Sequence, residues 1–131
     1  MPRYFTREEA EHLLPQIRPL MEEVQRRALS HQQLQEQVDA VGSRLKGNGH
    51  LGEGTALAER QRALAELRQS IARLVDEVQA LGVEVKDLAM GLIDFRALRN
   101  GDEVYLCWRV GEVGVEWWHP LEGGFGARQR L

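Results

Sequence analysis

Residues 74–85 read LVDEVQALGVEV, and the spacing of apolar residues changes within this stretch. Up to Leu81 the apolar positions recur every three or four residues, which is typical of a helix that packs along one side. Gly82 comes next, where a glycine often ends a helix in a left-handed conformation. From Val83 the apolar residues alternate with polar ones, as in a strand with one buried face. The stretch therefore predicts a helical region followed by a β-region.

Before Gly82 the chain predicts an antiparallel helical hairpin over about residues 7–81. A capping box formed by Thr6 and Glu9 should start its first helix. The helix should kink near Pro15 and Pro19, because each proline removes a backbone donor and crowds the preceding turn.

The hairpin should pack along two apolar stripes. The main rows are Ile17, Val24, His31, Val38 and Leu45 in the first helix, and Leu57, Leu64, Ile71 and Val78 in the second. Segment 46–54 holds four glycines and is expected to be the loop between them. Two helices alone leave apolar edges uncovered, so either the C-terminal region or a second copy must cover them. We favour a homodimer that forms a four-helix bundle.

After Gly82 the sequence predicts a small antiparallel β-unit over about residues 83–120, and the fold class is therefore α+β. Its clearest strands are 104–110 and 113–119, joined by a turn at Gly111, and residues 99–102 form another turn. In the expected register Arg109 lies opposite Glu116. One face, expected to be the core, then carries Val104, Leu106, Trp108, Val110, Val113, Val115, Trp117 and His119. The other face, which is half polar, carries Tyr105, Cys107, Arg109, Glu116 and Trp118. The segment 122–131 is expected to be a flexible, Gly-rich tail.

Composition limits the classes of function. The 131 residues fit a single domain, and the net charge of −3 is spread evenly over both halves. Nucleic-acid binding is not expected, because neither half is basic. No apolar run is long enough to cross a membrane, and no signal peptide is evident, so a cytoplasmic location is expected. A single Cys107 fits a reducing compartment.

Several short segments together resemble a known family. They are Tyr4-Phe5-Thr6, Leu13-Leu14-Pro15, Asn48-Gly49-His50, Gly82–Asp87, Gly91–Phe95, Val104–Trp108, Trp118-His119 and Gly124-Phe125. The chain is similar, from end to end, to a bacterial family catalogued as domain of unknown function number 2203. This resemblance implies a single-domain bacterial protein, and it implies no activity, cofactor or catalytic residue.

No motif identifies a reaction, a cofactor or a set of metal ligands. His119 is the strongest single candidate, because it ends a strand beside Trp118 and its imidazole suits both metal binding and proton transfer. His50 lies in the Gly-rich loop. A site could form from His50, His119 and a carboxylate such as Asp94 if the fold brings them together. Cys107 is interpreted as a buried strand residue, with a nucleophilic role as the alternative.

Two functions stay open at this point. The first is a non-enzymatic binding or assembly module, dimerised through the hairpin, whose Tyr105, Trp118, Phe125 and Arg128 form a recognition surface. The second is a small-molecule or metal site, with hydrolysis as one chemistry, formed by the Gly-rich loop and the His119 end of the β-hairpin.

Overall fold

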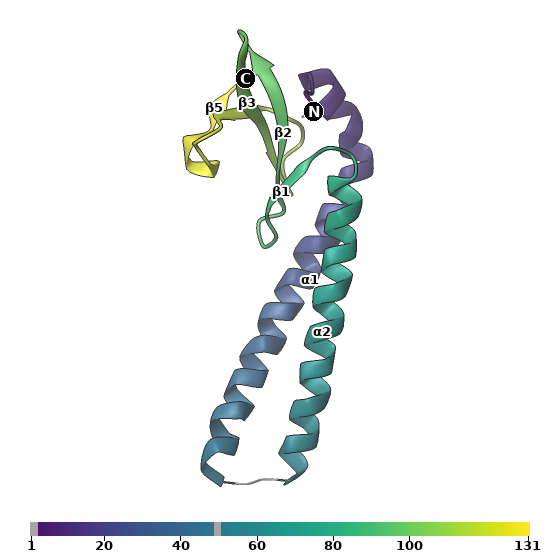
Figure 1. Ribbon diagram of the computed structural model, residues 1–131, viewed down its shortest axis with the longest axis vertical. Helices are drawn as coiled ribbons and strands as arrows, with labels where there is room; N and C mark the ends of the chain where they lie inside the picture. The colour runs from purple at the N-terminus through teal and green to yellow at the C-terminus, as the bar shows by residue number, and fades with distance from the viewer. Residues whose placement is uncertain (1–2, 49–50) are drawn as a thin grey trace.

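The computed structural model describes residues 3–48 and 51–131, and it shows a long helical hairpin with a small sheet at one end (Figure 1). The helices are α1 (Arg7–Asn48) and α2 (Leu51–Gln79). The elements that follow are β1 (Glu84–Asp87), β2 (Leu92–Arg99), β3 (Asp102–Arg109), β4 (Trp117–Pro120), the 3-10 helix η1 (Phe125–Ala127) and β5 (Gln129–Arg130). The expected α+β fold is confirmed.

The start of α1 has the predicted capping box. The backbone N–H of Glu9 donates to Thr6 Oγ1 at 3.1 Å, and the N–H of Thr6 donates to Glu9 Oε1 at 2.9 Å. Pro15 and Pro19 lie inside a continuous helix, and the first turns of α1 are inclined to the rest of it (Figure 1). Two donors are therefore satisfied at the helix start, and the helix bends where prolines interrupt its hydrogen bonding.

The predicted helical seam forms the hairpin contact. Among the described seam positions, Ile17, Val24 and Val78 are fully buried. The buried residues Val38, Leu64 and Ile71 continue the seam away from the sheet. No helix in the described part of the chain is both long and apolar enough to cross a membrane.

The connection between the helices is shorter than segment 46–54. The first helix extends to Asn48 and the second begins at Leu51, so the helices include most of the glycines. A glycine costs a helix only about 1 kcal/mol, and packing between two long helices can outweigh that cost. His50 lies outside the described residues.

The sheet is antiparallel throughout, with the order β1-β2-β3-β4-β5. The predicted turn between β2 and β3 is a tight two-residue turn, in which Asn100 and Gly101 have positive φ values of 53° and 84°. This geometry matches the right-handed twist of the strands and favours an Asn-Gly pair. Gly82 ends the helical region with a φ of 91°, as predicted.

One face of the sheet packs on the hairpin and makes the core. Alternate residues of β2 and β3 supply it: Ile93, Phe95, Ala97, Val104, Leu106 and Trp108. They meet apolar residues from α1, from the end of α2 and from the N-terminal segment. The Phe5 ring packs edge-on against Phe95 at 5.4 Å between centroids. The sheet is thus fixed to the hairpin end where both helices meet it.

The predicted strand 113–119 is wrong in length and in register. The strand β4 begins only at Trp117, and Leu106, not Cys107, lies opposite Trp118. Val113, expected in the core, is 87% exposed. Because side chains alternate, this shift of one residue moves every β4 side chain to the other face. Trp118 therefore faces the helices, and His119 faces away from them.

Side chains of α1 explain the shift. Arg18 donates to the backbone carbonyls of Glu112 and Val113, at 3.0 and 2.9 Å. The N–H of Val115 donates to a Glu11 carboxylate oxygen at 2.6 Å. This segment therefore bonds to the helix instead of extending the β-ladder, and pairing with β3 starts after it.

The C-terminal segment is also more ordered than predicted. The short strand β5 pairs with β4, placing Arg130 opposite Trp117 and Gln129 opposite Trp118. The N–H of Leu131 donates to the carbonyl of Glu116 at 2.9 Å. Residues expected to form a flexible tail thus supply the fifth strand.

Candidate metal centre

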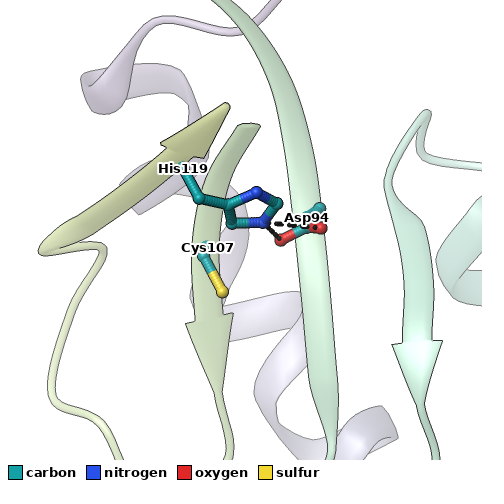
Figure 2. Close-up of side chains that lie close together, drawn as sticks. All are labelled: Asp94, Cys107 and His119. Atoms are coloured by element: carbon teal, nitrogen blue, oxygen red, sulfur yellow. Dashed lines mark hydrogen bonds and ion pairs between the residues drawn. The ribbon is translucent and has the colours of Figure 1, made fainter. Parts of the chain in front are cut away.

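Three neighbouring strands bring Asp94, Cys107 and His119 together on the sheet face that points away from the hairpin (Figure 2). Asp94 in β2 lies directly opposite Cys107 in β3. His119 in β4 lies opposite Tyr105, two residues along β3 from Cys107. The carboxylate oxygen, the thiol sulfur and an imidazole nitrogen all lie within 4.8 Å of one another. The register of the sheet therefore creates the cluster.

All three residues are buried: Cys107 is 0% exposed, His119 is 2% and Asp94 is 3%. Burying an ionisable group is costly unless it is paired and hydrogen-bonded. Asp94 stands between Ile93 and Phe95, whose side chains point into the apolar core. The carboxylate of Asp94 lies on the opposite side of the same strand, at a buried position where a hydrophobic side chain would cost less.

The hydrogen bonds of His119 define where its protons lie. Ring atom Nδ1 is 2.8 Å from the carbonyl oxygen of Pro120, which can only accept, so Nδ1 carries a hydrogen. Ring atom Nε2 lies 3.0 and 3.1 Å from the two carboxylate oxygens of Asp94. A second hydrogen must therefore lie between the ring and the carboxylate. The pair holds one buried proton at the centre of the cluster.

Burial controls the acidity of the other two groups. It raises the pKa of the Asp94 carboxyl, and the neighbouring His119 offsets part of that rise. Burial also raises the pKa of the Cys107 thiol to about 12, with a further contribution from the negative charge of Asp94. In the absence of a bound cation, Cys107 is therefore a neutral thiol at physiological pH.

The arrangement does not support Cys107 as a nucleophile. A catalytic cysteine needs a base that takes its proton. Both ring nitrogens of His119 are already engaged, one by Asp94 and the other by Pro120. The raised pKa of the thiol acts in the same direction, because it keeps the thiolate population very small.

The geometry is better suited to a metal ion. Ligand atoms around a tetrahedral zinc ion are roughly 3 to 4 Å apart, close to the spacing found here. Metal-binding histidines commonly donate their second ring N–H to a backbone carbonyl, which fixes the ring and exposes the other nitrogen. His119 has this arrangement, with Pro120 as the acceptor and Nε2 directed into the cluster.

Charged residues surround the cluster along the same face. Tyr105 packs beside His119, with ring centroids 5.4 Å apart, and its hydroxyl donates to Glu84 at 3.0 Å. Arg96 donates to that hydroxyl at 3.0 Å. Tyr105 is itself buried, so it forms part of the wall of the site.

The C-terminal residues form a separate stack of arginines and aromatic rings. Arg128 lies over the rings of Phe125 and Trp117, at 4.7 and 4.9 Å from their centroids. Its guanidinium also makes two short hydrogen bonds to the carboxylate of Glu112. Arg128 is therefore largely occupied within the chain. Trp118 packs on the core on the opposite face from Tyr105, so the four residues expected to form one recognition surface do not share a face.

The Gly-rich connection and His119, which were expected to form one site, lie far apart. Asn48 and Leu51, which flank the glycine-rich connection, are at the end of the hairpin farthest from the sheet (Figure 1). His119 and Asp94 do meet, as considered from the sequence. The third member of the described cluster is Cys107, a residue that sequence reasoning placed in no metal site. The sequence signal for this cluster is the placement of Asp94 in β2 and Cys107 in β3, each between two apolar residues whose side chains face the core.

The chain has an identifiable family. Residues 3–131 match the family described as "Uncharacterized conserved protein (DUF2203)". No curated protein and no solved structure matches the chain. The match covers nearly every residue, including all three members of the cluster, so this chain belongs to the DUF2203 family.

Proposed function

We propose that the protein binds one divalent transition-metal ion of the zinc class through Asp94, Cys107 and His119. The observation that carries the proposal is the convergence of three buried ligand-type side chains from three adjacent strands. A thiolate and an imidazole favour zinc-class metals over magnesium or calcium, which prefer oxygen ligands. Three protein ligands leave a fourth position for water or a small ligand.

The sheet is a suitable support for such a site. Each ligand lies within a strand rather than a loop, and the ring of His119 is oriented by Pro120. Strands hold side chains more rigidly than loops do. The metal would replace the proton shared by His119 and Asp94, and it would stabilise the thiolate of Cys107.

The test is calorimetric titration of Zn²⁺ into protein freed of metal by a chelator. The wild type should bind one ion per chain, and Cys107→Ser and His119→Gln should each weaken binding by at least about 100-fold. The matched control is His12→Gln, which changes an exposed histidine on α1 and should leave affinity unchanged. Circular dichroism of each variant checks that it is folded. Equal affinities for Cys107→Ser and the wild type would contradict the proposal.

Metal binding should also release protons. The ion displaces the hydrogen between His119 and Asp94, and it deprotonates the thiol of Cys107, so about two protons should leave per ion. Titration in buffers of different ionisation enthalpy measures this number, and affinity should rise with pH. Cys107→Ser should release about one proton fewer; release unaffected by that change would exclude Cys107 as a ligand.

A further inference from the structure

One side of the hairpin carries an apolar groove of about 650 Å³. It lies between α1, α2 and the turn that joins β1 to β2. Its apolar residues are Ala28, Ile71, Ala72, Val75, Leu88 and Ala89. Leu88 is 38% exposed, and Ala72 is also exposed. The groove therefore presents apolar surface that the chain itself leaves uncovered.

A second hollow on the hairpin has a different character. It measures about 520 Å³, and it is lined mainly by polar side chains, including Arg27, Glu66, Ser70 and Arg73. Charged residues at such positions are readily solvated, whereas the alanines and Val75 of the first groove are not. An interface should therefore form on the first side.

The charges beside the groove are self-complementary. Arg68, Ala72 and Asp76 are spaced by four residues, so they lie along one face of α2. If a second α2 runs antiparallel across this face, with the twofold axis at Ala72, then Arg68 of each copy lies opposite Asp76 of the other. The small side chain of Ala72 permits close approach at the axis. A twofold interface requires this kind of pairing, in which residue i meets j and j meets i.

The lining of the groove also includes a buried polar atom. Nε2 of His31 is shielded from solvent and has no hydrogen-bond partner among the described residues. His31 lines the groove next to α2. A buried polar atom without a partner is costly, and because Nε2 is already shielded in the single chain, a polar side chain of a docked helix can reach it only if the His31 ring turns.

We propose that this groove is the site at which a second copy of the chain docks, through antiparallel α2 helices related by a twofold axis at Ala72. The inference goes beyond the metal proposal, and neither depends on the other. Because Ala72 lies close to the end of α2 that leads into the sheet, the two sheets flank the axis, and the loop ends of the two hairpins form the far ends of the dimer. The groove residues become its buried core, while Arg68 and Asp76 form two symmetry-related ion pairs.

Charge reversal tests the pairing. Arg68→Glu and Asp76→Arg should each raise the dimer dissociation constant by at least about tenfold, because each sets like charges opposite one another. The double variant Arg68→Glu/Asp76→Arg exchanges the charges and should return to within about threefold of the wild type. Sedimentation over a range of concentrations measures the constants, and circular dichroism confirms folding. A wild-type monomer, or a double variant no better than the singles, would overturn the proposal.

Crosslinking tests the position of the axis. Ala72→Cys should be joined to its own copy by a short thiol-specific crosslinker, because the two residues meet at the axis. The control is Glu66→Cys, an exposed position on the polar hollow, which should remain uncrosslinked. Cys107 is buried in both variants. Equal crosslinking at the two positions, or none at Ala72→Cys, would contradict the proposed axis.

Discussion

The two faces of the sheet are built from the same strands, but one buries apolar side chains and the other buries polar ones. On the face toward the hairpin, Phe95 and Trp108 fill a core that needs almost no polar partner. On the other face, Asp94 and His119 are almost as buried, but they are hydrogen-bonded to each other, and His119 also donates to the carbonyl of Pro120. The first arrangement gains stability from apolar burial. The second gains little from apolar burial, so the difference teaches that burial alone does not account for the polar face.

The largest expected effect is on the apolar face. Trp108→Ala should lower the free energy of unfolding by about 3 to 5 kcal/mol, because the side chain is fully buried in the core. It also loses the hydrogen bond from the indole N–H to the carbonyl of Glu112. Denaturant unfolding measures the change. Val113→Ala, at an exposed position, is the control, and it should change stability by less than about 0.5 kcal/mol.

The next effect distinguishes the polar face from the apolar one. His119→Leu leaves Asp94 buried without its partner, and it should cost metal-free protein about 3 kcal/mol. Adding Asp94→Val removes the buried carboxyl that has lost its partner, so the double variant should be more stable than His119→Leu alone. Urea unfolding of both variants tests this order. A double variant that is clearly less stable than the single would mean that the pair is itself a main source of stability.

The effect that is smallest at neutral pH, where it is absent, is a difference in pH dependence. The pKa of the Cys107 thiol is about 12 in the folded metal-free protein, above the ordinary thiol value of 9.0. Between these two pH values the unfolded chain loses its proton first, so stability falls as pH rises through this window. The slope that Cys107 contributes approaches about 1.4 kcal/mol per pH unit between these two pH values. Below pH 9 the thiol is protonated in both the folded and the unfolded chain, so Cys107 contributes no slope there.

Cys107→Ala removes this thiol and should flatten the curve of stability against pH within that window. Denaturant unfolding of both proteins at several alkaline pH values measures the difference. Parallel curves would show that the thiol titrates alike in the folded and unfolded chains, against the role assigned to its burial.

The sequence is enough to predict the elements whose signals are local. The capping box of Thr6 and Glu9 forms as expected. The helix-ending Gly82 adopts the predicted left-handed conformation, and the predicted turn forms at Asn100 and Gly101. Each of these depends on residues a few positions apart. The helical seam is similarly accessible, because its period repeats along the whole hairpin.

The register of β4 is not accessible in the same way. It depends on Arg18 and Glu11, which lie about a hundred positions earlier and bind the backbone of residues 112–115. Local alternation is compatible with either register, and an error of one residue exchanges the two faces. Because of that exchange, His119 was predicted on the core face and Cys107 on the opposite face, so the two were not expected to meet. Asp94 and His119 were considered together, but their distance could come only from the fold.

The most direct test of the metal proposal is the absorption spectrum of metal-free protein titrated with Co²⁺, which reports both coordination and thiolate binding. We predict a thiolate-to-cobalt charge-transfer band in the near ultraviolet, and visible bands of tetrahedral strength, saturating at one ion per chain. In Cys107→Ser the charge-transfer band should be absent. A wild-type spectrum identical to that of free Co²⁺, or one unchanged by Cys107→Ser, would contradict a metal centre formed by Asp94, Cys107 and His119.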